Sequence, residues 1–171
     1  MRYGHTRTFT AIIICVLAAL LLVGCGTPGP TVVKTKHADN RIRLEHVALN
    51  VTDPPAMAEW YCKNLGMKIV KEGPPPVNAR FICDSGGNMM LELYTNPPDK
   101  IPDYRSMNPL ILHVAFMVEE IRAVRDKLLE AGATIVEDIN TIPTGDQILI
   151  MRDPWGLAIQ FVKRARPMLR R

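Results

Sequence analysis

The chain has 171 residues, enough for one medium-sized domain with a substantial hydrophobic core. Its 47% apolar and 22% charged residues are those of an ordinary globular protein, which excludes a disordered or fibrous chain. The formal net charge is +4, but five of the basic residues crowd into the segment 163–171. Because a nucleic-acid-binding protein spreads basic charge over a folded face, we expect no nucleic-acid partner.

Residues 1–24 are predicted to be a targeting segment. Arg2 and Arg7 precede an uncharged apolar run over residues 11–23, which is shorter than the about 20 residues that a membrane span needs. The run ends in Leu22-Val23-Gly24-Cys25, which resembles the bacterial lipobox, the site where a cysteine becomes the lipidated first residue of a mature lipoprotein. The alternative is an uncleaved signal anchor with an incidental cysteine.

The lipobox resemblance implies an exported protein that is anchored in the cell envelope by a lipid on Cys25. The residue after the cysteine is Gly26 rather than aspartate, which favours the outer membrane if the cell has one. Residues 25–41 are predicted to be the lipidated cysteine and a flexible tether, since they mix Gly, Pro, Thr and charge. The folded domain is then predicted over residues 42–163, followed by a solvated basic tail over residues 164–171.

The folded domain is predicted to begin with a strand over residues 42–51. Asp53 is a suitable N-cap residue and Pro54 suits the first position of a helix, which should end at Gly66. Three more strands should follow this helix, the last two joined by a hairpin through Ser85-Gly86-Gly87-Asn88; the three are expected over residues 67–70, 80–84 and 89–94.

A second set of elements follows a proline-rich link over residues 96–109. A strand over residues 112–118 places Leu112, Val114, Phe116 and Val118 on one apolar face and His113 on the other. A helix is predicted over residues 120–130. The remaining strands are expected around residues 135–136 and over residues 147–151 and 157–162.

The two sets of elements repeat each other. The pattern His-Val-Ala-x-x-Val begins at His46 and again at His113, 67 positions later. Leu91-Glu92-Leu93 similarly matches Ile159-Gln160-Phe161, 68 positions later. The chain is therefore predicted to be an internal duplication with an α+β fold, in which two tandem βαβββ modules form a curved mixed sheet.

Four polar residues interrupt the apolar strands at equivalent places, namely His46, Glu92, His113 and Gln160. Each is predicted to lie on the strand face opposite the helices, so that the four would converge inside a curved sheet. Two imidazoles, a carboxylate and an amide oxygen suit one divalent metal ion of the Zn, Ni, Mn, Fe or Co type. Any one of these residues alone would pass for a satisfied polar residue, but four such groups together are costly to bury without a shared purpose.

The chain resembles the vicinal oxygen chelate superfamily, which includes glyoxalase I, methylmalonyl-CoA epimerase, extradiol dioxygenases and bleomycin-binding proteins. The resemblance covers residues 42–163 and rests on the paired modules, the repeated His-Val strand, Leu65-Gly66, Ala131-Gly132 and the Asp-Pro-x-Gly turn that begins at Asp153. The glyoxalase I pattern is the most similar, and it implies metal ligands at His46, Glu92, His113 and Gln160.

The resemblance implies a metal-dependent lyase or isomerase of the glyoxalase I type that acts on a small oxygenated substrate. Glyoxalase-like enzymes carry a proton-transferring glutamate where this chain has Gln160, and an amide cannot accept that proton. Glu92 is the only carboxylate in the set and is therefore the predicted catalytic base. Superfamily members often pair modules across two chains, so a homodimer is also expected.

Two other functions stay open. One is a non-catalytic module that binds an antibiotic or a metabolite, and the other is a metal-dependent dioxygenase, since two histidines and a carboxylate also form the facial triad of iron oxygenases. The dioxygenase ranks lower because the superfamily pattern takes the carboxylate from the position of Gln160. Cys62 and Cys83 form either a disulfide or two independent thiols.

Overall fold

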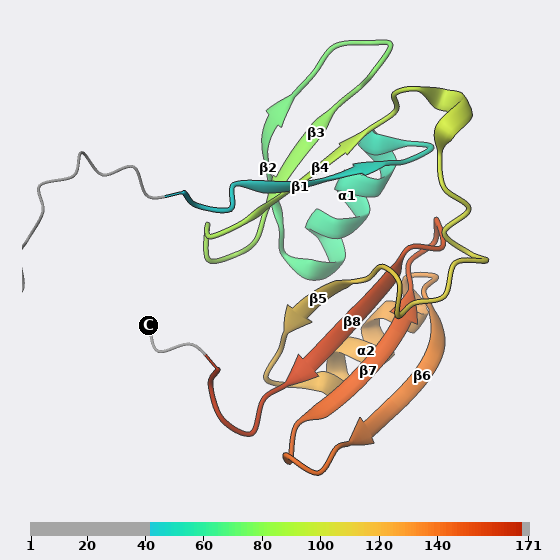
Figure 1. Cartoon of the computed structure of the whole chain (residues 1–171). Coiled ribbons are helices and arrows are strands. Elements are labelled where there is room, and N and C mark those ends of the chain that lie inside the picture. Colours follow the sequence, from blue (N-terminus) through green and yellow to red (C-terminus); the bar gives the residue numbers. More distant parts are fainter. Residues whose placement is uncertain (1–41, 169–171) are drawn as a thin grey trace, which may run out of the picture. The chain divides into compact units, whose positions relative to one another are not determined.

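The computed structural model describes residues 42–168, which form two modules, each a four-stranded mixed sheet with one helix (Figure 1). The first module contains, in chain order, β1 (His46–Asn50), α1 (Pro54–Leu65), β2 (Lys68–Glu72), β3 (Arg80–Cys83) and β4 (Met90–Tyr94). A short 3-10 helix, η1 (Pro98–Lys100), lies in the link between the modules. The second module contains β5 (Val114–Met117), α2 (Ile121–Glu130), β6 (Thr134–Thr141), β7 (Gln147–Arg152) and β8 (Ala158–Lys163). The predicted pair of βαβββ modules is confirmed.

Both sheets have the same topology. The strand order is β1-β4-β3-β2 in the first sheet and β5-β8-β7-β6 in the second, with a parallel first pair and antiparallel pairs after it. The register also repeats, because Ala48 lies opposite Glu92 in the first sheet and Ala115 lies opposite Gln160 in the second. The duplication seen in the sequence is therefore a duplication of strand pairing, which gives Glu92 and Gln160 equivalent positions.

Helix α1 begins and ends where local chemistry predicts. The Asp53 side chain accepts a hydrogen bond of 3.1 Å from the backbone amide of Ala56, and Pro54 occupies the first helical position. Gly66 ends the helix with φ of 68°, a left-handed conformation that glycine adopts without a Cβ penalty.

The core of each module lies between the helix and one face of its sheet. Leu49 and Leu91 project from neighbouring strands toward α1, which buries Met57 and Tyr61. In the second module, α2 buries Ile121 and Leu128. This alternation leaves His46 and Glu92 on the opposite face of the first sheet, as predicted.

Strand β5 is shorter than predicted. It begins at Val114, so His113 lies one residue before the strand rather than within it. The preceding segment turns, with the amide of Ile111 donating to the carbonyl of Asn108 at 2.9 Å, and the His113 ring bonds to the carbonyl of Pro109. These local hydrogen bonds compete with strand pairing, which is why the ladder starts later.

The C-terminal basic segment is held at its start. The Arg164 guanidinium lies 2.8 Å from a carboxylate oxygen of Asp146, and the amide of Ala165 donates to the other oxygen at 2.8 Å. These two contacts, the backbone amide first, lower the pKa of Asp146. The basic tail is therefore attached to the β6–β7 turn through its first two residues, Arg164 and Ala165.

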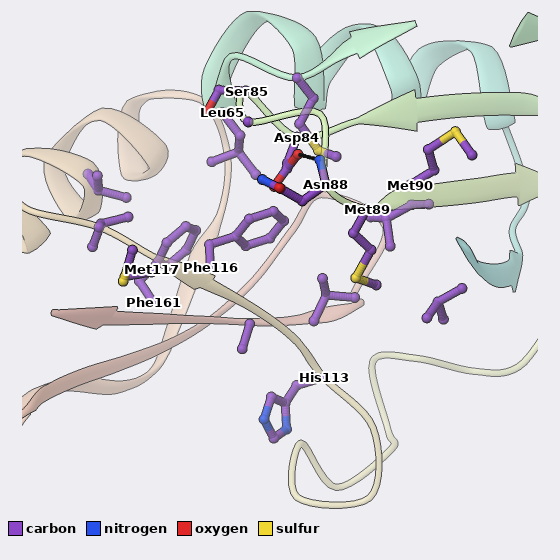
Figure 2. Close-up of a pocket in the computed structure, with 18 of the residues that line it drawn as sticks. Leu65, Asp84, Ser85, Asn88, Met89, Met90, His113, Phe116, Met117 and Phe161 are labelled. Atoms are coloured by element: carbon purple, nitrogen blue, oxygen red, sulfur yellow. Dashed lines mark hydrogen bonds between the residues drawn. The ribbon is translucent and has the colours of Figure 1, made fainter. Parts of the chain in front are cut away.

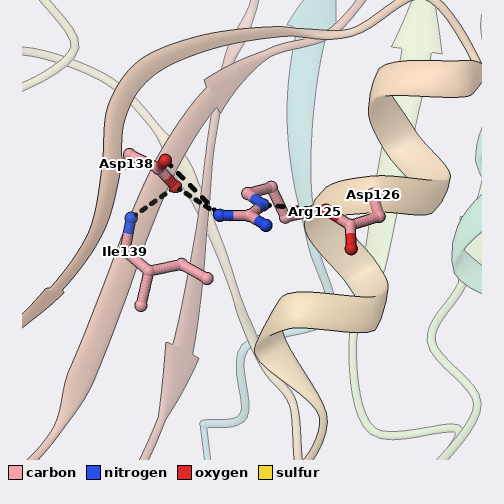
Figure 3. A network of polar contacts seen from close by, with 4 residues as sticks. All are labelled: Arg125, Asp126, Asp138 and Ile139. Atoms are coloured by element: carbon pink, nitrogen blue, oxygen red, sulfur yellow. Dashed lines mark hydrogen bonds and ion pairs between the residues drawn. The ribbon is translucent and has the colours of Figure 1, made fainter.

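Helix α2 is joined to β6 by a small polar network (Figure 3). The Arg125 guanidinium bonds to the Asp126 carboxylate at 2.9 Å and to the Asp138 carboxylate at 3.3 Å. The Asp138 carboxylate also accepts from the amide of Ile139 at 2.7 Å. Because the two acidic side chains are exposed, the ion pairs add little to stability beyond orienting the arginine.

Within residues 42–168 no helix is long and apolar enough to cross a membrane. The predicted signal peptide, Cys25 and the tether lie outside the described residues.

Candidate functional site

His46 and Glu92 lie together on the first sheet. The parallel register of β1 and β4 brings them onto the face opposite α1, and Nε2 of His46 lies 3.3 Å from Oε2 of Glu92. Both side chains are partly exposed, at 32% for His46 and 24% for Glu92. This pair is a preformed imidazole and carboxylate that remains open to solvent or to a ligand.

The His46 ring is held from two further sides. Its Nδ1 lies 2.5 Å from Oε2 of Glu45, the residue just before β1. The ring also packs edge-to-face against Phe81 of β3, with 5.6 Å between ring centroids. Each ring nitrogen of His46 therefore faces a carboxylate, and the contact at Nδ1 is the shorter of the two.

His113 has a matching arrangement in the second module. Its Nδ1 lies 2.8 Å from the backbone carbonyl oxygen of Pro109, which can only accept a hydrogen bond. The proton of the neutral ring therefore sits on Nδ1, and Nε2 keeps its lone pair. Metal-binding histidines commonly donate their second ring nitrogen to a carboxylate or a backbone carbonyl in this way. Both histidines thus have the chemistry of Nε2 ligands.

Gln160 lies on β8 with Ala115 opposite it on β5 and Ile150 opposite it on β7. Ala158 and Val162, its neighbours on the same strand face, are buried, and so is Ile150. Met90 and Tyr94, the neighbours of Glu92 on its strand face, are only partly buried, so the surroundings of Gln160 are the more buried, although Ala48 and Ala115 opposite the two residues are both exposed. A neutral amide suits this position better than an unpaired carboxylate would.

The described part of the chain does not gather all four predicted ligands at one point. Among residues 42–168, no group of three or more His, Cys, Asp or Glu side chains lies close enough to hold a metal ion. The protein brings His46 and Glu92 together and places His113 and Gln160 in the second module. The donor types and the free Nε2 atoms fit a divalent ion, and the assignment of the four ligands stays a prediction.

A cavity of about 510 Å³ lies between the end of α1, the β3–β4 hairpin and β5 (Figure 2). Phe116, Phe161 and Met89 supply apolar walls, and Asp84 and Asn88 lie on the hairpin side. His113 is the one predicted ligand in its lining. The size and lining suit a small, largely apolar molecule.

Four hydrogen bonds join α1 to the second module, and two of them run from the Lys127 ammonium to the carbonyls of Lys63 and Asn64 at 3.4 and 2.8 Å. The Trp60 indole donates to the carbonyl of Ala131 at 2.8 Å, and the Tyr61 hydroxyl donates to the Asp153 carboxylate at 2.9 Å. Burial raises the pKa of Asp153 to about 6, against the lowering effect of the hydrogen bonds that its carboxylate accepts from the Tyr61 hydroxyl and from backbone amides. Burial also raises the pKa of Tyr61, and the nearby Asp153 charge adds to it. These contacts hold α1, which forms one side of the cavity, against the second module.

The link between the modules is held by Arg152. Its guanidinium donates to the carbonyls of Tyr104, Gly156 and Met107 at 2.6, 2.8 and 2.7 Å.

Cys62 and Cys83 are free thiols and not a disulfide, the alternative that the sequence left open. The sequence reasoning missed Glu45 and Pro109. The adjacent carboxylate of Glu45 could have been noticed, whereas a backbone carbonyl leaves no signal in the sequence.

Comparisons with known proteins agree with this architecture. The family model of the Glyoxalase/Bleomycin resistance protein/Dioxygenase superfamily matches residues 43–161. The chain is 33% identical over 99 residues to an ethylmalonyl-CoA/methylmalonyl-CoA epimerase of Cereibacter sphaeroides, a match that covers 55% of this chain and 74% of the relative. It is 25% identical over 125 residues to a biphenyl-2,3-diol 1,2-dioxygenase of Rhodococcus globerulus, a match that covers 69% of this chain but only 61% of the relative.

Solved structures share the fold at lower identity. A glyoxalase family protein from Bacillus cereus superposes with a TM-score of 0.63 at 19% identity, over 74% of this chain and 97% of that one. An antibiotic binding protein from Streptomyces sp. CB03234 superposes with a TM-score of 0.60 at 16% identity, over 74% of this chain and 98% of that one. With two βαβββ modules of the same topology and a family match over most of its length, the chain belongs to the Glyoxalase/Bleomycin resistance protein/Dioxygenase superfamily.

Proposed function

We propose that the domain is a divalent-metal-dependent lyase or isomerase of the glyoxalase I type, acting on a small oxygenated substrate. The observation that carries the proposal is the hydrogen bonding of the two histidine rings. The Nδ1 atoms of His46 and His113 both bond to oxygen acceptors, which leaves each Nε2 able to ligate. The carboxylate of Glu92 lies 3.3 Å from one of these Nε2 atoms.

The proposed metal ligands are His46, Glu92, His113 and Gln160. When bound, the ion would polarise a substrate oxygen and stabilise the negative charge that develops on it. Glu92 is the only carboxylate of the set and is the residue proposed to accept a proton from the substrate. Gln160 offers an amide oxygen to the ion but no basic site.

A homodimer is part of the proposal. Strands β1 and β5 are edge strands in their sheets, so each has one side without a partner strand in the described chain. Exposed apolar residues surround these edges; they are Ile42, Leu44, Leu110, Ile111 and Met117. An uncovered edge with exposed apolar side chains favours self-association.

The location is proposed from the sequence. The lipobox resemblance supports lipidation at Cys25 and anchoring in the cell envelope, in the outer membrane if the cell has one. The substrate would then be a small molecule met outside the cytoplasm.

The test is the metal content of the full-length protein, purified without a chelating tag. Elemental analysis should find about one divalent ion per site, as a set of four ligands implies. His46→Ala and His113→Ala should each abolish binding, whereas Asn64→Ala, a change at the cavity wall, should not. A wild-type protein that stays metal-free after reconstitution with zinc, nickel, manganese, iron and cobalt would refute the proposal.

A non-catalytic binding module is the second candidate function. The cavity of about 510 Å³, with its phenylalanine and methionine walls, favours it. In that case an apolar ligand should bind the metal-free protein, and Phe116→Ala should weaken binding while His46→Ala leaves it unchanged.

A dioxygenase ranks third, because position 160 holds a glutamine and not a carboxylate. A dioxygenase would contain bound iron and would consume oxygen.

A further inference from the structure

Glu45 occupies an unusual position beside the proposed ligand His46. In a regular strand, adjacent side chains project to opposite faces of the sheet. Glu45 lies one residue outside β1, so its side chain is free of this alternation and reaches Nδ1 of its neighbour at 2.5 Å. Its backbone is nevertheless anchored, because its carbonyl accepts a 3.2 Å hydrogen bond from the amide of Met90.

His46 therefore has a carboxylate at each ring nitrogen. Oε2 of Glu45 lies 2.5 Å from Nδ1, and Oε2 of Glu92 lies 3.3 Å from Nε2. The neutral ring carries one proton, so the two carboxylates compete for it. With the proton on Nδ1, the lone pair of Nε2 faces Glu92 and is available to a cation. With the proton on Nε2, the ring would donate to Glu92, and the ligating atom would be blocked.

We propose that Glu45 is a positioning residue that keeps the His46 proton on Nδ1 and thereby prepares Nε2 for a divalent cation between His46 and Glu92. This inference rests on the proposed metal site, and it adds a residue that is not itself a ligand. The edge-to-face contact with Phe81 holds the ring plane, so Glu45 has only to select the tautomer. A carboxylate behind a metal-bound histidine is a known way of orienting the ring and raising its basicity.

His113 provides a control within the same molecule. Its Nδ1 bonds to the backbone carbonyl of Pro109, which no side-chain substitution removes. Changes at Glu45 should leave the tautomer of His113 untouched.

The first measurement needs no metal. Full-length protein in detergent micelles, labelled with ¹⁵N-histidine and held at a pH where the imidazoles are neutral, reports each tautomer through its ring nitrogen shifts. Wild-type His46 should be protonated on Nδ1. Glu45→Ala should move the proton to Nε2, where Glu92 accepts it, while Glu45→Gln should keep it on Nδ1 because the amide oxygen still accepts. A Glu45→Ala protein whose His46 stays protonated on Nδ1 would overturn the proposal.

The second measurement is the affinity for Zn²⁺ or Co²⁺ in competition with a chelator. Glu45→Ala should weaken binding by about 10- to 100-fold, the usual cost of losing such a partner. Glu45→Gln should recover most of this loss. Glu130→Ala removes the same charge from the exposed end of α2 and should have no effect. Equal losses in Glu45→Ala and Glu45→Gln, or in Glu130→Ala, would show a simple charge effect and overturn the proposal.

The two measurements separate two failures. A wild-type protein that binds no metal refutes the proposed function, and the tautomer of His46 in the Glu45 variants still decides what Glu45 does to the ring. If the wild type binds metal and Glu45→Ala binds it equally tightly, the proposed function stands and the proposed role of Glu45 is refuted.

Discussion

The Tyr61 hydroxyl donates a 2.9 Å hydrogen bond to Asp153, so a helix of the first module is bonded to the turn before the last strand of the second. Both side chains are almost fully buried, with exposed fractions of 0% and 2%. The other carboxylate oxygen accepts from the backbone amides of Trp155 and Leu157, at 3.0 and 2.9 Å. The contact satisfies a buried carboxylate and joins the two modules at the same time.

Tyr61→Phe should lower the free energy of unfolding by roughly 1.5–3 kcal/mol, the usual range for a hydrogen bond to a charged group. The reason is that a buried carboxylate loses one of its donors while the aromatic packing stays. Urea denaturation of the two proteins measures the difference. Tyr94→Phe on β4 is the matched control, and it should lower the free energy of unfolding by less than Tyr61→Phe does. Equal losses in both variants would show that Asp153 does not depend on Tyr61.

Asp153 should give stability an unusual pH dependence. Its folded pKa of about 6 lies above the ordinary value of 3.8 because of burial, so the folded protein binds this proton more tightly than the unfolded chain does. The resulting stabilisation is present below about pH 4 and is lost as the pH rises through 6. The shift corresponds to about 3 kcal/mol.

The measurement compares the wild type with Asp153→Asn in urea at intervals from pH 4 to pH 7. The stability of the wild type relative to the variant should fall across this window, since asparagine does not titrate. The difference isolates Asp153 from carboxylates such as Asp146, whose lowered pKa acts in the opposite direction. A constant difference between the two proteins would show that Asp153 has an ordinary pKa.

Gly156→Ala should be more damaging than Gly66→Ala, although both glycines have positive φ, 94° and 68°. A Cβ at Gly66 would meet nothing within 4 Å, so the cost is the left-handed conformation, about 1–2 kcal/mol. At Gly156 it would lie 2.9 Å from the backbone nitrogen of Arg105, so the link between the modules would also have to move. Thermal melts of the two variants test this order, and the reverse order would contradict it.

Gln160→Glu should strengthen metal binding, because it adds a second negative charge to the proposed ligand set. Glu92→Gln should weaken it for the converse reason. If the glyoxalase-type chemistry is latent, Gln160→Glu should also raise isomerase activity on hemithioacetals, since it restores a base.

Without metal, Gln160→Glu should be less stable than the wild type, because the new carboxylate lies beside buried Ala158 and Val162. Metal titrations and urea melts with and without the ion check both expectations.

Cys25→Ser should abolish labelling of the protein by a fatty-acid analogue and leave a slower-migrating precursor. The reason is that lipid attachment requires the thiol. Metabolic labelling followed by gel electrophoresis is the measurement, and undiminished labelling would contradict lipidation at this residue.

The sequence by itself determined the modules, because the signals for them are local. Asp53, Pro54 and Gly66 bound a helix through their own backbone preferences, and alternation along β1 and β4 assigns Leu49 and Leu91 to the core. The repeat then implied that whatever pairing one module makes, the other makes too. The structure shows this equivalence in the register, with Glu92 opposite Ala48 and Gln160 opposite Ala115.

The tertiary structure decided what these positions contact. A ring nitrogen meets a partner only at hydrogen-bond distance, and no periodicity predicts that Nδ1 of His113 meets the carbonyl of Pro109. The turn that supplies this carbonyl also delays β5 to Val114, which strand propensity alone could not show. The bond between Tyr61 and Asp153 joins residues 92 positions apart, and it exists because packing α1 against the second module removes both groups from water.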